Sequence, residues 1–259
     1  MTSGARDTSV VAQDGYAFRF DWGLDGLRAL APVADVVVIV DILRFTSAVC
    51  AAIESGATVL PYPFDRAGAV VYAAERGAVA AGERELGGPS LSPTDLLTVA
   101  RGARIVLPSP NGATLSFAAR ELGARRVFAG SLRNAAATAR AVRDVVANGG
   151  VVAAIAAGER WSVTDGSLRP AVEDFIGAGA VLTALDPSGA VAAPCCSPEA
   201  RAARAAFLDA RPNLHHFLSG SASGRELIGR GWEDDVATSA ALDVAVVAAE
   251  LIGDEFVAV

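Results

Sequence analysis

A run of five branched apolar residues, Val36–Val40, leads directly into Asp41. A continuous apolar run of this length is typical of a strand that is buried on both faces of a parallel sheet. The next stretch, residues 45–57, has helical composition and ends near Gly56. Because parallel strands need a crossover connection that is usually a helix, this pair of segments predicts an α/β fold.

The alternation continues along most of the chain. Strands are predicted at residues 16–23, 35–41, 58–62, 79–83, 104–109, 125–131 and 151–159. Helices are predicted at residues 45–57, 64–78, 92–103, 112–124, 133–150 and 170–185, with Ser92 as an N-cap. The pattern predicts a largely parallel or mixed sheet flanked by helices in a three-layer α/β/α arrangement.

The C-terminal part is expected to be a more helical lobe. Residues 186–200 are rich in Pro, Gly and Ser and mark a possible joint inside a single unit that spans residues 1–259. Residues 197–210 give the clearest helix of this lobe. Arg201, Arg204 and Arg211 are interpreted as part of a solvated helix face.

Composition excludes several classes of protein. The formal net charge is −7, and all 22 basic residues are arginine, which argues against a nucleic-acid surface. No apolar run approaches the roughly 20 residues that span a bilayer. The N-terminus lacks a basic start followed by an apolar stretch, so we expect a cytoplasmic protein, and a homodimer is common for such enzymes.

Polar side chains follow five of the predicted strands, at the point where each ends. Ligands of open α/β sheets bind outside the carboxyl ends of the strands, so these residues are expected to gather into one site. One such residue alone is more often a helix cap. The set comprises Asp41, Glu83, Ser109, Asn111, Ser131, Asn134 and Glu159.

The chemistry of this set points to a cation and an oxyanion. Carboxylates repel one another unless a cation joins them, and oxygen ligands suit Mg²⁺. Arg44 and Arg84 offer planar forks for phosphate, sulfonate or carboxylate oxygens, although each could instead pair with its neighbouring acid. The turn at residues 108–114 could cradle an anion through its N–H groups. The residues alone therefore favour hydrolysis of a small phosphate ester.

The same residues resemble the signature of the 2-phosphosulfolactate phosphatase (ComB-like) family. The similar blocks are "VDILRFTSAVCAAIESGA", "AGERELGG", "SPNGAT", "AGSLRNAAATA", "EDFIGAGAVL" and "SASGRELIGRGWEDDVATSAALD", in the family's order. The resemblance implies a Mg²⁺-dependent acid phosphatase that converts 2-phospho-3-sulfolactate to 3-sulfolactate and phosphate, a step of coenzyme M biosynthesis. Beyond the strand ends, it singles out Glu173, Asp174 and Asp235.

These considerations assign roles to the candidate residues. Catalytic roles are predicted for Asp41, Arg44, Glu83 and Arg84. Substrate binding is predicted for Thr46, Ser47, Ser109, Asn111, Gly112, Ser131 and Asn134. Metal ligands are expected among Asp41, Glu83, Glu159, Glu173 and Asp174.

Several alternatives stay open. The nucleophile is either a metal-bound water or Asp41 itself, although position 43 is Leu and the D-x-D pair of haloacid-dehalogenase-type phosphatases is missing. Glu173 and Asp174 could form a solvated first turn of a helix.

The chain also departs from the family's pattern. Leu91 stands where the family has Asn, and Pro110 and Ala113 replace hydroxyl residues. Another small phosphorylated acid as the substrate, or a non-catalytic anion-binding relative, are therefore further hypotheses.

Overall fold

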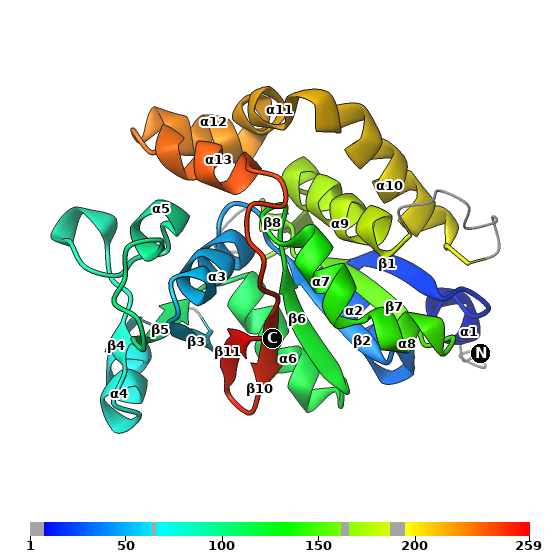
Figure 1. Ribbon diagram of the computed structural model, residues 1–259, viewed down its shortest axis with the longest axis horizontal. Helices are drawn as coiled ribbons and strands as arrows, with labels where there is room; N and C mark the ends of the chain where they lie inside the picture. Colours follow the sequence, from blue (N-terminus) through cyan, green and yellow to red (C-terminus); the bar gives the residue numbers. More distant parts are fainter. Residues whose placement is uncertain (1–7, 64–65, 162–165, 187–194) are drawn as a thin grey trace, which may run out of the picture.

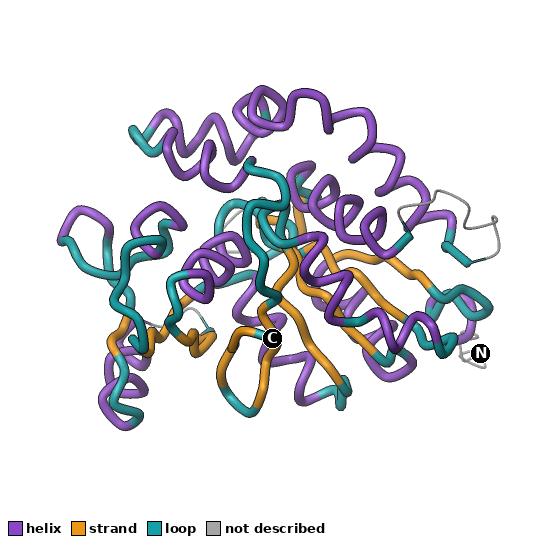
Figure 2. Tube along the Cα trace, in the orientation of Figure 1, coloured by secondary structure: helices purple, strands orange, loops and turns teal. Residues whose placement is uncertain are grey.

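A computed structural model describes residues 8–63, 66–161, 166–186 and 195–259. Nine of its strands form one sheet, in the order β1-β7-β2-β6-β10-β11-β3-β5-β4. Helices lie on both sides of this sheet, which confirms the predicted three-layer α/β/α arrangement (Figures 1 and 2). The strands of this sheet are β1 (Phe18–Trp22), β2 (Val36–Val40), β3 (Thr58–Tyr62), β4 (Val79–Ala80), β5 (Arg104–Pro108), β6 (Arg126–Gly130), β7 (Val152–Ala156), β10 (Ala249–Ile252) and β11 (Glu255–Ala258).

The helices follow the predicted alternation, with two shorter than expected. They are α1 (Thr8–Val11), α2 (Gly23–Leu30), α3 (Phe45–Glu54), α4 (Arg66–Glu75), α5 (Pro93–Leu96), α6 (Gly112–Glu121), α7 (Ala135–Ala141), α8 (Arg143–Ala147), α9 (Val172–Leu185), α10 (Pro198–Ala210), α11 (Leu214–Gly220), α12 (Ala222–Gly229) and α13 (Glu233–Ala240). Three 3₁₀ turns, η1 (Ala31–Val33), η2 (Arg84–Leu86) and η3 (Arg211–Asn213), and a small hairpin, β8 (Glu159–Arg160) and β9 (Leu168–Arg169), complete the described elements.

Strand β2 lies between β7 and β6 and is parallel to both. All five of its residues are buried, and they alternate between two apolar clusters. Val36, Val38 and Val40 pack with the cluster that includes α7, α9 and α10, whereas Val37 and Ile39 pack with α2 and α6. The apolar run is thus buried on both faces, as its composition predicts.

A C-terminal hairpin makes the sheet mixed. Strands β10 and β11 pair with each other and join β6 to β3, and all three of these pairings are antiparallel. The sequence predicted a more helical lobe here and indicated no strand in it. The signal was a two-residue Gly253-Asp254 loop between short apolar runs, which is typical of a β-hairpin.

Two predicted helices are shortened or divided in the structure. The segment at residues 92–103 is helical only as far as Leu96, although Ser92 caps it by accepting a hydrogen bond from the Asp95 N–H. The Ser55 hydroxyl lies 3.0 Å from the Leu96 carbonyl oxygen and 2.7 Å from that of Leu97, so these carbonyls are bonded outside the helix. The segment at 133–150 is divided into α7 and α8 at Val142.

Helices α11, α12 and α13 of the predicted helical lobe lie along the top of the molecule in Figure 1. The expected clearest helix of this lobe, α10, instead packs on α9 in the main apolar cluster, and its Arg204 pairs with Asp186 rather than facing solvent. The chain then returns to the middle of the sheet as β10 and β11. The joint predicted near residues 186–200 lies largely outside the described residues, at 187–194. Within the described part of the chain, no helix has the length and apolar character needed to cross a bilayer.

Candidate active site

Asp41 follows β2 directly and is buried in a tight loop. Its Oδ1 accepts a hydrogen bond from the Phe45 N–H at 3.1 Å, and its Oδ2 accepts one from the Gly112 N–H at 2.9 Å. The second bond joins the end of β2 to the start of α6, which follows β5. The sheet contains two groups of parallel strands, β1-β7-β2-β6 and β3-β5-β4, and the candidate site includes residues from both groups.

Gly112 permits this approach because it has no side chain. A Cβ at this position would lie 2.8 Å from Asp41 Oδ2 and would clash with the ring of Phe45. The close approach of the Asp41 carboxylate therefore explains why residue 112 is a glycine. The predicted role of Gly112 in substrate binding stays a prediction.

Burial raises the pKa of Asp41 to about 7. The negative charge of Glu159 contributes to this shift after burial, whereas the hydrogen bonds from the Phe45 and Gly112 N–H groups act against it. At neutral pH the metal-free carboxyl is therefore divided between its protonated and ionised forms. A carboxyl in this state can accept or donate a proton.

Asp174 lies in the first turn of α9 and is 3% exposed. Its Oδ1 accepts from the Ile42 N–H at 2.7 Å and its Oδ2 from the Gly158 N–H at 2.9 Å, so it links the loops after β2 and β7. Burial, followed by the charge of Asp41, raises its pKa well above the usual range. Glu173 beside it is 2% exposed. The alternative of a solvated first turn is therefore wrong for both acids.

Glu159 completes a group of four neighbouring acids with Asp41, Glu173 and Asp174. It accepts a 3.0 Å hydrogen bond from the Asn111 side-chain amide. Burial raises its pKa, and the bond from Asn111 opposes that shift. The neighbouring residues Asn111 and Gly112 thus each donate a hydrogen bond to an acid, Asn111 to Glu159 and Gly112 to Asp41.

Arg44 and Arg84 are held by acids from the far end of the chain. Arg44 Nη1 donates to Asp235 Oδ2 at 2.6 Å, and its guanidinium lies 4.6 Å from the centre of the Trp232 ring. Arg84 donates from both terminal nitrogens to Asp234, at 3.1 and 2.6 Å, and its Nη1 lies 3.3 Å from Asp235 Oδ2. Asp235 therefore joins both arginines predicted to bind an oxyanion.

A small cavity of about 150 Å³ opens at the Asp41 carboxylate. Its lining comprises Asp41, Leu43, Arg44, Leu91, Ser109, Pro110, Asn111, Glu159, Ser223, Glu226 and Leu227. The last three come from α12 and close the cavity from the side of the helical lobe. We call this space the Asp41 cavity.

A second cavity of about 390 Å³ adjoins the Asp41 cavity and shares Arg44, Leu91 and Pro110 with it. Glu83, Arg84, Arg230 and Trp232 also line this second cavity, which we call the arginine cavity. Glu83 thus lies in the arginine cavity rather than among the four acids. Its predicted catalytic and metal-binding roles stay predictions.

The remaining predicted residues hold loops in place. Thr46 and Ser47 are fully buried, and their hydroxyls lie 2.9 and 2.8 Å from the carbonyl oxygens of Asp41 and Ile42. Asn134 accepts from both the N–H and the hydroxyl of Ser131, at 2.8 and 3.0 Å, and both residues are fully buried. Their assignment to substrate stays a prediction.

Ser109 lines the Asp41 cavity, and its Oγ lies 3.3 Å from the Asn111 N–H. Of the positions that depart from the family's pattern, Leu91 and Pro110 line both cavities. Ala113 is instead fully buried in the core beneath α3. Only the first two changes therefore alter the surface that a ligand would meet.

Sequence reasoning missed the contribution of the helical lobe. Ser223, Glu226, Arg230, Trp232 and Asp234 line the cavities or hold their arginines. They lie within the closing block "SASGRELIGRGWEDDVATSAALD", in which only Asp235 was singled out.

A comparison with family models supplies the deciding observation. The model of the 2-phosphosulpholactate phosphatase family matches residues 27–252, nearly the whole chain. This chain belongs to that family. It is therefore a phosphoric monoester hydrolase by family, and the matched region contains every residue that lines the Asp41 cavity and the arginine cavity. A search of curated proteins finds no match.

Proposed function

We propose that this member of the 2-phosphosulpholactate phosphatase family hydrolyses 2-phospho-3-sulfolactate to 3-sulfolactate and phosphate, with Mg²⁺ as cofactor, and that the reaction serves coenzyme M biosynthesis. One observation carries the proposal: the Asp41 cavity, with its carboxylates, opens beside a cavity lined by three arginines. The first suits a metal-bound phosphoryl group, and the second suits further acidic groups of the same substrate.

The residues present fit Mg²⁺ by their chemistry. Among the described residues, no three acidic, histidine or cysteine side chains are arranged to hold one ion together. Mg²⁺ does not require such a group, because it is usually bound by one or two carboxylates together with water and substrate phosphate oxygens. Asp41 and Glu159 line one cavity, and the charge of Glu159 raises the pKa of Asp41, so these two acids would hold the ion. When bound, Mg²⁺ would neutralise negative charge on the phosphoryl oxygens.

Within this proposal, Asp41 has one of two roles. As a general base, its carboxylate takes a proton from the attacking water, and its pKa near neutrality suits this role. As a nucleophile, one of its oxygens attacks phosphorus and the ester P–O bond breaks, so that the 3-sulfolactate oxygen leaves and takes a proton from water; water then hydrolyses the aspartyl-phosphate to phosphate and the free carboxylate. We favour the first role, because both carboxylate oxygens already accept backbone hydrogen bonds.

The arginines would orient the substrate. Arg44 lines both cavities and can reach a phosphoryl oxygen from one side and a second acidic group from the other. Arg84 and Arg230 line only the arginine cavity and would bind the sulfonate or carboxylate. Trp232 lies against both Arg44 and Arg230 and limits their movement.

A second candidate function is hydrolysis of another small phosphorylated acid. Leu91 and Pro110 favour it, because they place apolar surface where the family pattern provides hydrogen-bonding side chains. Such a change would weaken recognition of one polar substrate group while retaining the acids and arginines.

A substrate panel tests these functions. Phosphate release is measured from 2-phospho-3-sulfolactate, phospholactate, phosphoglycerate and p-nitrophenyl phosphate, each with Mg²⁺ and with EDTA. The proposal expects the highest kcat/KM for the sulfonated ester and loss of turnover in EDTA. A higher kcat/KM for another phosphorylated acid supports the second function. Tight binding of every ester without release of phosphate identifies a non-catalytic relative instead.

The role of Asp41 is tested in the same assay. Asp41→Asn is expected to abolish turnover in either mechanism. Acid quenching of the wild type during turnover, followed by peptide mass spectrometry, separates the two: a phosphorylated Asp41 peptide indicates the nucleophile, and its absence at high enzyme occupancy indicates the general base.

A further inference from the structure

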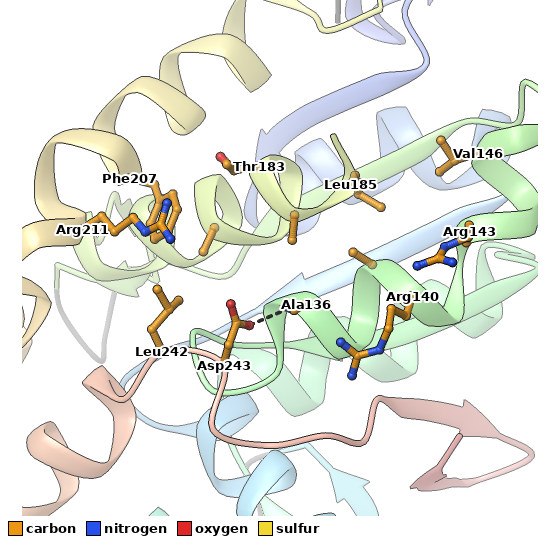
Figure 3. A pocket seen from close by; sticks show the side chains of 13 residues that line it. Ala136, Arg140, Arg143, Val146, Thr183, Leu185, Phe207, Arg211, Leu242 and Asp243 are labelled. Atoms are coloured by element: carbon orange, nitrogen blue, oxygen red, sulfur yellow. Dashed lines mark hydrogen bonds between the residues drawn. The ribbon is translucent and has the colours of Figure 1, made fainter. Parts of the chain in front are cut away.

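A separate groove lies between α7 and α8 on one side and α9 and α10 on the other. It has a volume of about 490 Å³ and shares no lining residue with the Asp41 cavity or the arginine cavity. Figure 3 shows the side chains of this groove. No role in phosphate-ester hydrolysis is assigned to any of them.

The floor of the groove is apolar. Leu185 at the end of α9, Phe207 of α10 and Leu242 line it together with several alanines and Val146. Apolar surface that remains accessible in a concave site favours a ligand that can cover it.

Three arginines lie around this apolar floor. Arg140 and Arg143 come from the α7–α8 side, and Arg211 lies on the opposite side beside Phe207 (Figure 3). Arg140 makes only a long 3.3 Å bond to the Val246 carbonyl oxygen. Among the described residues, neither Arg143 nor Arg211 has a hydrogen-bond or ion-pair partner, whereas Arg44, Arg84, Arg126 and Arg133, for example, all pair with carboxylates.

Of the described residues that line the groove, Asp243 is the one acid, and its carboxylate is already engaged. Asp243 accepts a 2.7 Å hydrogen bond from the Ala136 N–H and so caps the first turn of α7. The groove therefore has a local excess of positive charge in a chain whose net charge is −7. A cluster of exposed guanidinium groups without acidic partners attracts anions.

We propose that this groove binds a small organic anion with an apolar body, such as a carboxylate, phosphate or sulfonate attached to a hydrocarbon part. Guanidinium forks match the oxygens of all three acidic groups. Alcohols of the same size would cover the floor but leave the arginines without an anionic partner. The inference does not depend on the proposed phosphatase reaction, because the groove has its own residues.

Fluorescence titration with 8-anilinonaphthalene-1-sulfonate tests the proposal, since this dye combines a sulfonate with an apolar body. We expect saturable binding at one site. The double variant Arg143→Gln/Arg211→Gln is expected to raise the dissociation constant at least about tenfold, because two charge-assisted contacts are lost. The control Arg201→Gln/Arg225→Gln removes the same charge from exposed positions outside the groove and is expected to bind as the wild type does.

Competition identifies the site and the ligand chemistry. Octanoate is expected to displace the dye, octan-1-ol to displace it much less, and inorganic phosphate to leave it bound. A dissociation constant in the groove variant within twofold of the wild-type value overturns the proposal. Equal displacement by phosphate from the wild type and from the groove variant overturns it as well, because the dye then occupies the catalytic cavities. The proposal is also overturned if the folded wild-type protein does not bind the dye saturably.

Discussion

Asp235→Asn is the substitution that tests the arrangement of the two arginines most sharply. Asp235 lies in α13 and is fully buried. Its Oδ2 pairs with Arg44 at 2.6 Å and with Arg84 at 3.3 Å, and its Oδ1 accepts from the Ser92 hydroxyl at 2.5 Å. The substitution keeps the size of the side chain and removes the charge that both guanidinium groups share.

The expected loss of stability follows from these contacts. Removing one partner of a buried ion pair costs about 3–5 kcal/mol, because an unpaired charge remains. Here the Arg44 side chain is 14% exposed and Arg84 retains Asp234, so we expect the lower part of this range, about 3 kcal/mol. A displacement of Arg44 by about 1 Å would also lower kcat/KM by about 100-fold.

The assay combines urea unfolding with steady-state kinetics on two substrates. 2-Phospho-3-sulfolactate has acidic groups for the arginine cavity, whereas p-nitrophenyl phosphate has only the phosphoryl group. Asp235→Asn should therefore lower kcat/KM for the sulfonated ester more than for the aryl ester. Asp234→Asn is the matched control: its side chain is 47% exposed and it pairs with Arg84, so its cost should stay below about 1 kcal/mol.

Equal behaviour of the two variants would refute this reasoning. If Asp235→Asn and Asp234→Asn unfolded at the same urea concentration, the buried carboxylate would not hold the arginines as described. If Asp235→Asn lost stability but kept the wild-type ratio of kcat/KM between the two substrates, Asp235 would be important only for folding.

Three further results are expected. Gly112→Ala should cost about 1–3 kcal/mol in thermal or urea unfolding and remove most activity, because its Cβ would displace the Asp41 carboxylate or the Phe45 ring; wild-type stability and turnover would contradict this. In EDTA, Asp41→Asn should unfold at a higher temperature than the wild type at pH 8, and the gain should shrink toward pH 4. Because burial raises the pKa of Asp41 in the folded protein, its protonated form stabilises the wild type at low pH. This stabilisation falls by about 1.4 kcal/mol for each pH unit and is lost as the pH rises through about 7. Parallel pH profiles of the two proteins would contradict this prediction. Mg²⁺ added at pH 7.5 should raise the melting temperature of the wild type and raise that of Glu159→Gln much less, because the ion relieves repulsion among the acids; equal shifts would remove Glu159 from the metal site.

Much of the fold could be predicted from local pattern. The run Val36–Val40 indicated a strand buried on both faces, and the regular alternation of strands and helices predicted the three layers. The pairing of β10 and β11 with β6 and β3 was missed, because the position of a hairpin within a sheet depends on contacts between distant segments. The bonds from the Ser55 hydroxyl to the carbonyl oxygens at the end of α5 are further contacts of this kind.

The candidate site was predictable where a polar residue lies within three residues of the end of a parallel strand. Asp41, Asn111 and Glu159 come together in this way. The solvated alternative for Glu173 and Asp174 failed because the Ile42 and Gly158 N–H groups bond to Asp174 inside the core. The roof of the Asp41 cavity and the acids that hold the arginines come from α12 and α13, and their place follows from how these helices pack.

Crystals grown with Mn²⁺ and inorganic phosphate would test the central claim most directly, because the anomalous signal of Mn²⁺ locates a metal site without assuming its ligands. We predict one strong peak inside the Asp41 cavity, in contact with Asp41 or Glu159, and a phosphate ion between that peak and Arg44. A peak elsewhere on the protein, or a phosphate ion bound away from Arg44 in crystals saturated with both, would contradict it.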